Sequence, residues 1–95
     1  MRFLTKVKTG DTYAVHTGDY AGELLIYIKK KDSKYGFLSI PTMVNRDIPV
    51  DVFESARNSG IIKFVEVVPS FVIKTSIAQY NKNENSSNRR QQSDP

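Results

Sequence analysis

The amino-acid sequence predicts a small α+β domain, in which a mostly antiparallel sheet of about five to six strands carries one α-helix over about residues 49–59. Three observations support this fold class. Apolar and polar residues alternate in several short segments, which is typical of strands. Turn-forming residues separate these segments. A single segment in the middle of the chain combines the signals that start and stop a helix.

The N-terminal part predicts two short strands, each followed by a tight turn. The segment RFLTKVK, residues 2–8, alternates in polarity, and so does TYAVH, residues 12–16. Thr-Gly-Asp follows each of them, at residues 9–11 and 17–19. Glycine tolerates a positive φ and aspartate can bond to nearby backbone. A phosphate-binding loop would need a longer glycine-rich stretch that leads into a helix, so we interpret the repeated triplet as two turns.

Residues 23–40 predict a long β-hairpin. Two apolar runs flank a polar link at residues 31–34, and Pro41 ends the second run because proline has no backbone N–H to donate to a ladder. A period of two places Leu24, Ile26 and Ile28 on one face and Leu25, Tyr27 and Lys29 on the other. Residues 42–47 form either a short edge strand or a loop.

The helix signal lies in DIPVDVFESARNSG, residues 47–60. Asp47 can cap its start, and Pro49 suits its first turn. Gly60 suits a left-handed C-terminal cap. These signals together predict one helix that begins near residue 49.

Two further strands and a tail are predicted downstream. IIKFVEVV, residues 61–68, is apolar on both faces, which indicates either a central strand covered on both sides or a sheet packed against a helix. FVIKTSIAQY, residues 71–80, alternates again. Residues 81–95 contain no hydrophobic residue, so we expect one domain over residues 1–80 and a flexible, disordered polar tail over 81–95. The main alternative is a small, partly closed β-barrel of the SH3-like kind, with the helix plugging one end.

The predicted core takes apolar residues from all of these elements. Its members are Phe3, Val7, Val15, Leu24, Ile26, Ile28, Leu38, Val52, Phe53, Ile62, Phe64, Val65, Val67, Phe71, Ile73 and Ile77.

Composition restricts the chemistry that the chain can perform. Its 95 residues include one histidine and no cysteine, which excludes disulfides, thiolate nucleophiles and cysteine zinc sites. No apolar run suits a signal peptide or a membrane span, so we expect a cytoplasmic protein with no membrane partner. His16 could bind a metal with Asp11 and Asp19 only if both turns folded to the same side. We therefore expect no metal, no cofactor and no enzymatic activity.

The most suggestive functional feature is a group of lysines at the tip of the hairpin. The set comprises Lys29, Lys30, Lys31 and Lys34, with Tyr27 and Tyr35 beside them. Lysines contact phosphates and tyrosines stack on unpaired bases. This set predicts binding of RNA or single-stranded nucleic acid, in keeping with a net charge of +4. The alternative is that the lysines keep the apolar segment ELLIYI from pairing with itself.

A second candidate site is acidic. Asp47, Asp51 and Glu54 recur at helical spacing and could line one face of the predicted helix. They could also simply complement the helix dipole, with Glu54 paired to Arg57. The alternative function is therefore a protein-binding inhibitor or adaptor, for example a small accessory protein of the viral or phage type, that acts through this face or a sheet edge. The sequence leaves the partner and the oligomeric state open.

Overall fold

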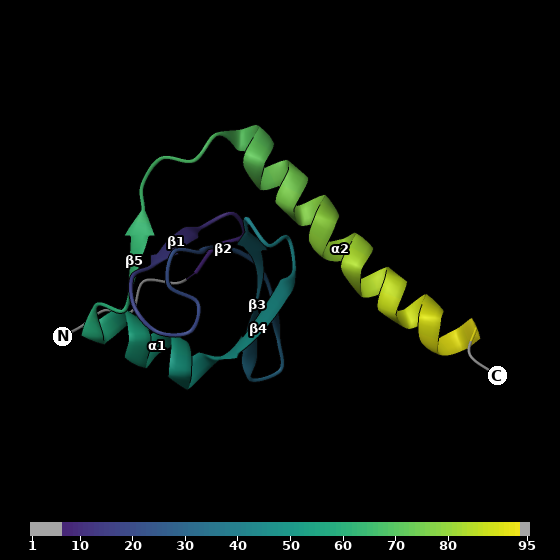
Figure 1. Cartoon of the computed structure of the whole chain (residues 1–95), viewed down its shortest axis with the longest axis horizontal. Helices are drawn as coiled ribbons and strands as arrows, with labels where there is room; N and C mark the ends of the chain where they lie inside the picture. The colour runs from purple at the N-terminus through teal and green to yellow at the C-terminus, as the bar shows by residue number, and fades with distance from the viewer. Residues whose placement is uncertain (1–6, 94–95) are drawn as a thin grey trace.

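The computed structural model describes the backbone of residues 7–93 and the side chains of residues 7–85. Five antiparallel strands form one sheet in the order β4-β3-β2-β1-β5, with a helix against each of its faces (Figure 1). The elements are β1 (Thr12–Val15), β2 (Leu24–Lys31), β3 (Lys34–Ile40), β4 (Asn45–Pro49), α1 (Val50–Ser59), β5 (Ile62–Val65) and α2 (Ser70–Ser93). The predicted α+β class and the mostly antiparallel sheet are confirmed.

The sheet curls into an open half-barrel (Figure 1). Its outer strands β4 and β5 do not pair with each other, and α1 packs against both of them. The helix therefore lies across the opening, which is close to the plugged-barrel alternative but without closure. Residues 42–47 resolve into a loop followed by β4, so the edge-strand interpretation holds from Asn45 onward.

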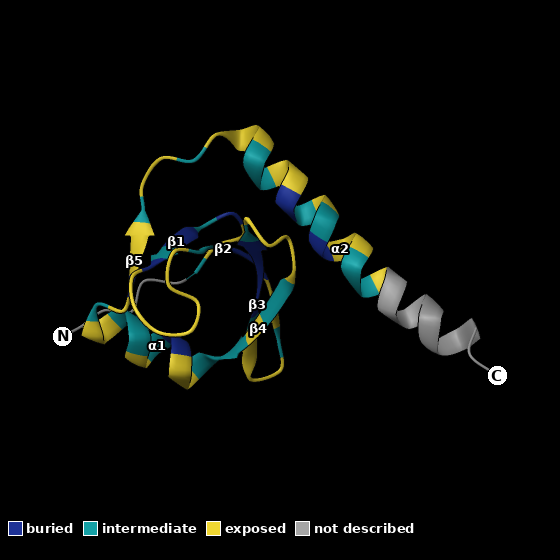
Figure 2. Cartoon of the chain, in the orientation of Figure 1, coloured by how far each residue is buried: buried dark blue, intermediate teal, exposed yellow. Residues whose placement is uncertain are grey.

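One half of the core lies between the sheet and α1 (Figure 2). Phe53 of α1 packs with its ring 5.1 Å from the rings of both Tyr13 and Phe37. Contacts of this kind add to the free energy gained by burying the rings. The helix ends at Gly60, in the left-handed conformation that its sequence predicted. It begins after Pro49, with no side-chain cap, so the prediction that Asp47 caps it is wrong: Asp47 lies in β4 and faces α2 instead.

The other half of the core lies between the sheet and α2. Ile26, Ile28 and Leu38 of the sheet pack there against Tyr80, with Val72 and Ile77 at the margin. Tyr80 and Leu38 are fully buried, at 0% exposure. The two faces of β2 are therefore both covered, each by a different helix.

A β-bulge changes the direction in which the lysines of β2 point. The pairing of β2 with β3 shifts register between Tyr27 and Lys29, and a bulge interrupts the strict alternation of side chains. Ile28 lies in the α2-side core with Ile26, as alternation predicts, whereas Lys29 lies on that same side and pairs with Glu84 of α2. The prediction that Lys29 shares a face with Leu25 and Tyr27 is wrong for this reason.

The repeated Thr-Gly-Asp triplet forms two turns, as predicted. Gly10 and Gly18 have φ angles of +99° and +95°. The carboxylate of Asp11 accepts a hydrogen bond of 2.9 Å from the backbone N–H of Lys8. Residues 2–6 of the predicted first strand lie outside the described residues, and residues 7–8 are not in a strand.

Of the two interpretations of residues 61–68, the central strand is wrong, because β5 lies at the edge of the sheet. The sheet against a helix is correct, because α1 packs against β5. β5 spans only Ile62–Val65 and pairs with β1 alone. Phe64 is 53% exposed and Val67 is 84% exposed, so both are wrong as core predictions. The apolar pattern cannot distinguish a covered strand from one that presents an apolar side chain at an open edge.

The prediction of a strand over residues 71–80 is wrong, because helix α2 covers this segment. Pro69, expected only to end the preceding strand, accepts the first helical hydrogen bond from the N–H of Val72. Val72, Ser76 and Tyr80 then recur at the spacing of one helical face, and the last two are buried. Alternation and helical spacing coincide in this segment, and packing on the sheet selects the helix.

The helix also crosses the predicted boundary at residue 80. Asn83 and Glu84 form side-chain contacts with the sheet, so the predicted flexible tail does not begin at residue 81. The flexibility of residues 86–95 stays a prediction.

The predicted core and the observed one overlap only in part. Val15, Ile26, Ile28, Leu38, Phe53 and Ile62 are buried as predicted, whereas Val52, Phe64, Val67 and Phe71 are exposed. Five large buried residues were not predicted: Tyr13, Leu25, Tyr27, Phe37 and Tyr80. Phe3 lies outside the described residues.

Candidate functional site

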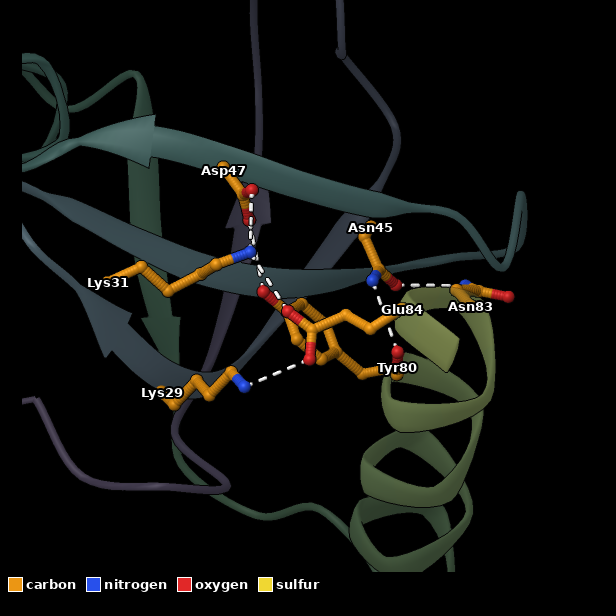
Figure 3. A network of polar contacts seen from close by, with 7 residues as sticks. All are labelled: Lys29, Lys31, Asn45, Asp47, Tyr80, Asn83 and Glu84. Carbon is orange, nitrogen blue, oxygen red and sulfur yellow. Dashed lines mark hydrogen bonds and ion pairs between the residues drawn. The ribbon is translucent and has the colours of Figure 1, made fainter. Parts of the chain in front are cut away.

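The four predicted lysines divide into two pairs. The bulge in β2 directs Lys29 and Lys31 toward α2. There the Nζ atom of each lysine lies 2.9 Å from a carboxylate oxygen of Glu84 (Figure 3). Lys31 also contacts Asp47 at 3.1 Å. Lys30 and Lys34 are exposed, and neither has an ion-pair partner among the side chains of residues 7–85.

Tyr80 lies at the centre of the polar network around Lys31. Its hydroxyl donates to Asp47 Oδ1 at 3.1 Å, and the ammonium groups of Lys29 and Lys31 lie 5.8 Å and 5.7 Å from its ring centroid. Burial raises the pKa of Tyr80 to about 12, and Asp47 adds to this shift. The phenol therefore remains a neutral hydrogen-bond donor at neutral pH.

The same network favours the ionised forms of Lys31 and Glu84. The hydrogen bond from Lys29, supported by Lys31, holds the pKa of Glu84 below its ordinary value. The hydrogen bond to Glu84, followed by that to Asp47, raises the pKa of Lys31. These groups therefore stay ionised near neutral pH, and they connect β2 and β4 to α2.

Two asparagines complete the attachment of α2 to β4. Asn45 donates to the backbone carbonyl of Tyr80 at 3.2 Å, and Asn83 donates to Asn45 Oδ1 at 2.9 Å (Figure 3). The sequence did not predict that Tyr80, Asn83 and Glu84 belong to this network, because it assigned residues 71–80 to a strand and residues 81–95 to a tail. The available signal was the spacing of Tyr80 and Glu84, which are one helical turn apart.

The predicted stacking tyrosines do not lie beside the paired lysines. Tyr27 is 7% exposed and lies in the core between the sheet and α1. The Tyr35 ring lies 5.3 Å from the ring of Tyr27 and 5.4 Å from that of Phe53. Both tyrosines therefore contribute to packing, and the aromatic ring next to Lys29 and Lys31 is that of Tyr80.

The three predicted acids do not form one surface. Asp47 faces α2, whereas Asp51 accepts a hydrogen bond of 2.9 Å from the N–H of Val52 at the start of α1. Glu54 pairs with Arg57 at 3.7 Å, as its spacing predicted. In the part of the chain that the structure describes, no three histidine, aspartate or glutamate side chains converge on a possible metal position.

An apolar hollow of about 320 Å³ lies on the α1 side of the molecule. No sequence pattern predicts it, because its lining comes from α1, the β1–β2 loop and the four strands β1, β2, β4 and β5. The lining residues are Val15, Thr17, Gly18, Asp19, Tyr20, Leu25, Ile48, Val52, Phe53, Ala56, Ile61 and Ile62. A second hollow, of about 390 Å³, shares Val52, Ala56 and Ile61 with it and adds Asp51 and Ser55.

The loop between β1 and β2 forms one wall of the first hollow, and Arg46 of β4 holds this wall in place. Its guanidinium donates two hydrogen bonds to the Glu23 carboxylate, at 3.2 Å and 3.0 Å, and lies 4.1 Å from the ring centroid of Tyr20. Arg46 keeps the pKa of Glu23 below its ordinary value, with help from the hydroxyl of Ser39. A bidentate pair of this kind gives the loop a defined position.

Neither helix, within residues 7–93, is long and apolar enough to cross a membrane. No protein family, no curated protein and no solved structure matches this chain.

Proposed function

We propose that this chain is a small, non-enzymatic module that binds another protein, and that the hollows beside α1 receive an apolar segment of the partner. The observation that carries the proposal is the first hollow, of about 320 Å³, with its mostly apolar lining. Partner proteins commonly place their most important side chains in apolar concavities of this kind.

The ridge between the two hollows supports a partner segment rather than a small molecule. Val52 and Ile61 line both hollows and are 54% and 39% exposed. A partner with two apolar anchors would fill both hollows and cover this ridge, which removes more apolar area from water than filling either hollow alone. A short amphipathic helix with anchors one turn apart has this form.

The charges around the hollows favour a basic partner. Asp19 lines the first hollow and Asp51 lines the second. Among the described residues, no lysine or arginine lines either of them. Lysine or arginine residues at the ends of the partner segment would therefore complement the two carboxylates, which contributes mainly to specificity and association rate.

The test uses a synthetic helical peptide with two leucines four residues apart and lysines at both ends. We expect saturable binding by fluorescence anisotropy, with amide shifts in nitrogen-15 spectra centred on Val52 and Ile61. Val52→Asp should weaken binding about tenfold, as expected when an apolar anchor site is lost. Val44→Asp is the matched control, since Val44 is also exposed and lies outside both hollows.

Two further comparisons make the test decisive. A peptide with glutamine in place of its lysines should bind more weakly to the parent, and Asp19→Asn should reduce that difference. Equal binding by V52D, V44D and the parent would exclude the hollows as the site. If the peptide shows no saturable binding even at millimolar concentration, the proposal of a basic, helical partner segment is overturned.

A second candidate function, binding of RNA or single-stranded nucleic acid, rests on Lys30 and Lys34. Both are exposed and can approach phosphates without breaking an ion pair within the described residues. We rank it second because Lys29 and Lys31 are already paired with Glu84 and Asp47, and because Tyr27 is buried.

This second candidate is tested with fluorescent twenty-nucleotide oligo-dT and oligo-U. If both lysines engage phosphates, the affinity should fall with salt at a log–log slope of about −1.4, or roughly −0.7 for each phosphate on a single strand. The Lys30→Gln/Lys34→Gln double variant should abolish this dependence. An oligonucleotide affinity that does not respond to salt, or to the double variant, would exclude the candidate.

A further inference from the structure

We propose that the free edge of β5 accepts an extended segment of a partner protein as an additional antiparallel strand, with an acidic residue of that segment beside Lys63. This surface adjoins the first hollow, whose lining includes the side chain of Ile62, but it uses the backbone edge of β5 and does not depend on the hollow being filled. β5 pairs only with β1, so its second edge has no strand against it among the described residues (Figure 1).

The pairing of β5 with β1 determines which backbone groups face this edge. The register places Ala14 opposite Lys63 and Tyr13 opposite Phe64, and the N–H of His16 donates to the carbonyl of Ile61 at 2.8 Å. Hydrogen-bonded pairs alternate along an antiparallel ladder. Residues 61, 63 and 65 therefore bond to β1.

The intervening residues of β5 direct their backbone groups the other way. Ile62 and Phe64 turn their N–H and C=O groups toward the free edge, at the spacing that an added antiparallel strand requires. The closeness of the Tyr13 and Phe64 rings, 5.6 Å apart, agrees with their position as a non-hydrogen-bonded pair. An incoming strand thus finds two complete donor and acceptor sets.

The two edges of the sheet differ in how well they are protected against such pairing. Exposed strand edges are commonly blocked by charged residues and proline. β4 has both, with Arg46 and Asp47 in ion pairs and Pro49 at its end. β5 contains no proline, and Phe64 in its middle is 53% exposed.

The side chains of β5 specify the chemistry of the partner strand. Phe64 points to the face that carries α1, and Lys63 points to the opposite face because strand side chains alternate. Lys63 is exposed and has no ion-pair partner within residues 7–85. A partner strand with an apolar residue next to Phe64 and an acidic residue next to Lys63 would satisfy both positions.

A second copy of this chain is a poorer occupant for the same reason. Two β5 strands paired about Phe64 would place Lys63 of one copy diagonally across from Lys63 of the other, on the same face. Like charges so placed repel each other. The lysine therefore disfavours self-association and favours an acidic partner.

The test uses a synthetic eight-residue peptide in which valine and glutamate alternate. We expect amide shifts in nitrogen-15 spectra at Ile62 and Phe64 and slower hydrogen exchange of these two amides. Lys63→Glu should weaken binding about tenfold and should strengthen binding of a valine–lysine peptide. Lys74→Glu, on the exposed side of α2, is the control with the same change of net charge.

Backbone pairing is distinguished from side-chain binding by N-methylation of alternate peptide bonds. Methyl groups on the amides that face β5 should abolish binding, and methyl groups on the other amides should not. The V52D variant should bind the strand peptide normally, so failure of the hollows and failure of the edge give different results.

Three results would overturn the inference. The first is equal binding by K63E and K74E. The second is binding that tolerates methylation of either set of amides. The third is a concentration-dependent dimer, seen by analytical ultracentrifugation, that the Phe64→Lys variant abolishes, because β5 would then serve a second copy.

Discussion

The side chain of Tyr80 occupies the space that a Cβ atom at Gly36 would fill. Any Cβ at Gly36 would meet both the hydroxyl and the Cζ carbon of Tyr80, which is fully buried against the sheet. Gly36 lies in the middle of β3, where glycine has no advantage of its own. It is needed there because a helix far along the chain places an aromatic ring against the strand.

Gly36→Ala should therefore destabilise the protein by about 1–3 kcal/mol, the range for forcing an extra methyl group into a packed site. The free energy of unfolding is measured by urea denaturation. The matched background is Tyr80→Leu, whose shorter side chain leaves room for the methyl group. In that background Gly36→Ala should cost much less, and strictly additive effects would contradict the contact.

The two lysine pairs should differ in their effect on stability. Lys29→Gln/Lys31→Gln removes the ion pairs to Glu84 and Asp47 and should lower the free energy of unfolding by up to about 1 kcal/mol, since partly exposed ion pairs contribute little. Lys30→Gln/Lys34→Gln makes the same change of net charge and should be nearly neutral. If both double variants lower the free energy of unfolding equally, the ion pairs of Lys29 and Lys31 with Glu84 and Asp47 do not stabilise the fold.

Acid should weaken the attachment of α2. The Lys29 and Lys31 hydrogen bonds lower the pKa of Glu84 in the folded state below its ordinary 4.5. The resulting stabilisation is complete above that value and is lost as the pH falls through the lower, folded-state pKa. Glu84→Gln should therefore reduce the loss of unfolding free energy between pH 5 and pH 3, while lowering stability at pH 7.

The control for this pH effect is Glu66→Gln. Glu66 is exposed and has no ion-pair partner among the described residues. Its replacement should leave the acid dependence close to that of the parent. If E84Q and E66Q give superimposable pH profiles, the carboxylate of Glu84 does not stabilise the fold.

Truncation should separate the attached part of α2 from the residues that follow it. A chain ending at Asn81 loses the contacts of Asn83 and Glu84 with the sheet. A loss of about 1 kcal/mol corresponds to a decrease in Tm of about 4–8 °C for a domain of this size. A chain ending at Asn85 retains these contacts and should melt within about 2 °C of the parent. Identical Tm values for both truncations would show that the contacts contribute nothing.

Local chemistry accounts for the elements that were predicted correctly. The β2–β3 hairpin follows from alternation on either side of a polar link, and α1 follows from the start and stop signals at Pro49 and Gly60. Turn residues around Gly10 and Gly18 need only their own backbone conformation. None of these features requires knowledge of a distant segment, because the hydrogen bonds and dihedral angles involved lie within a few residues.

For the candidate sites, the sequence shows which residue types are present but not how they are arranged. The lysine cluster is visible in the sequence, but the bulge that turns Lys29 toward α2 is not, because alternation carries no mark of an inserted residue. The hollow beside α1 was not predictable at all. Its walls come from α1, the β1–β2 loop and strands that meet only when the sheet curls.

The sequence by itself determined the α+β class, the long hairpin, the first helix and the presence of a basic cluster. Only the tertiary structure decided that residues 71–80 are helical, because their apolar residues satisfy the spacing of a strand as well as that of a helix face. The choice depends on Tyr80 finding a position without a side chain at Gly36, and on Glu84 meeting Lys29 and Lys31. Both conditions join residues more than forty positions apart, and their free energy of burial and pairing exists only once the sheet has formed.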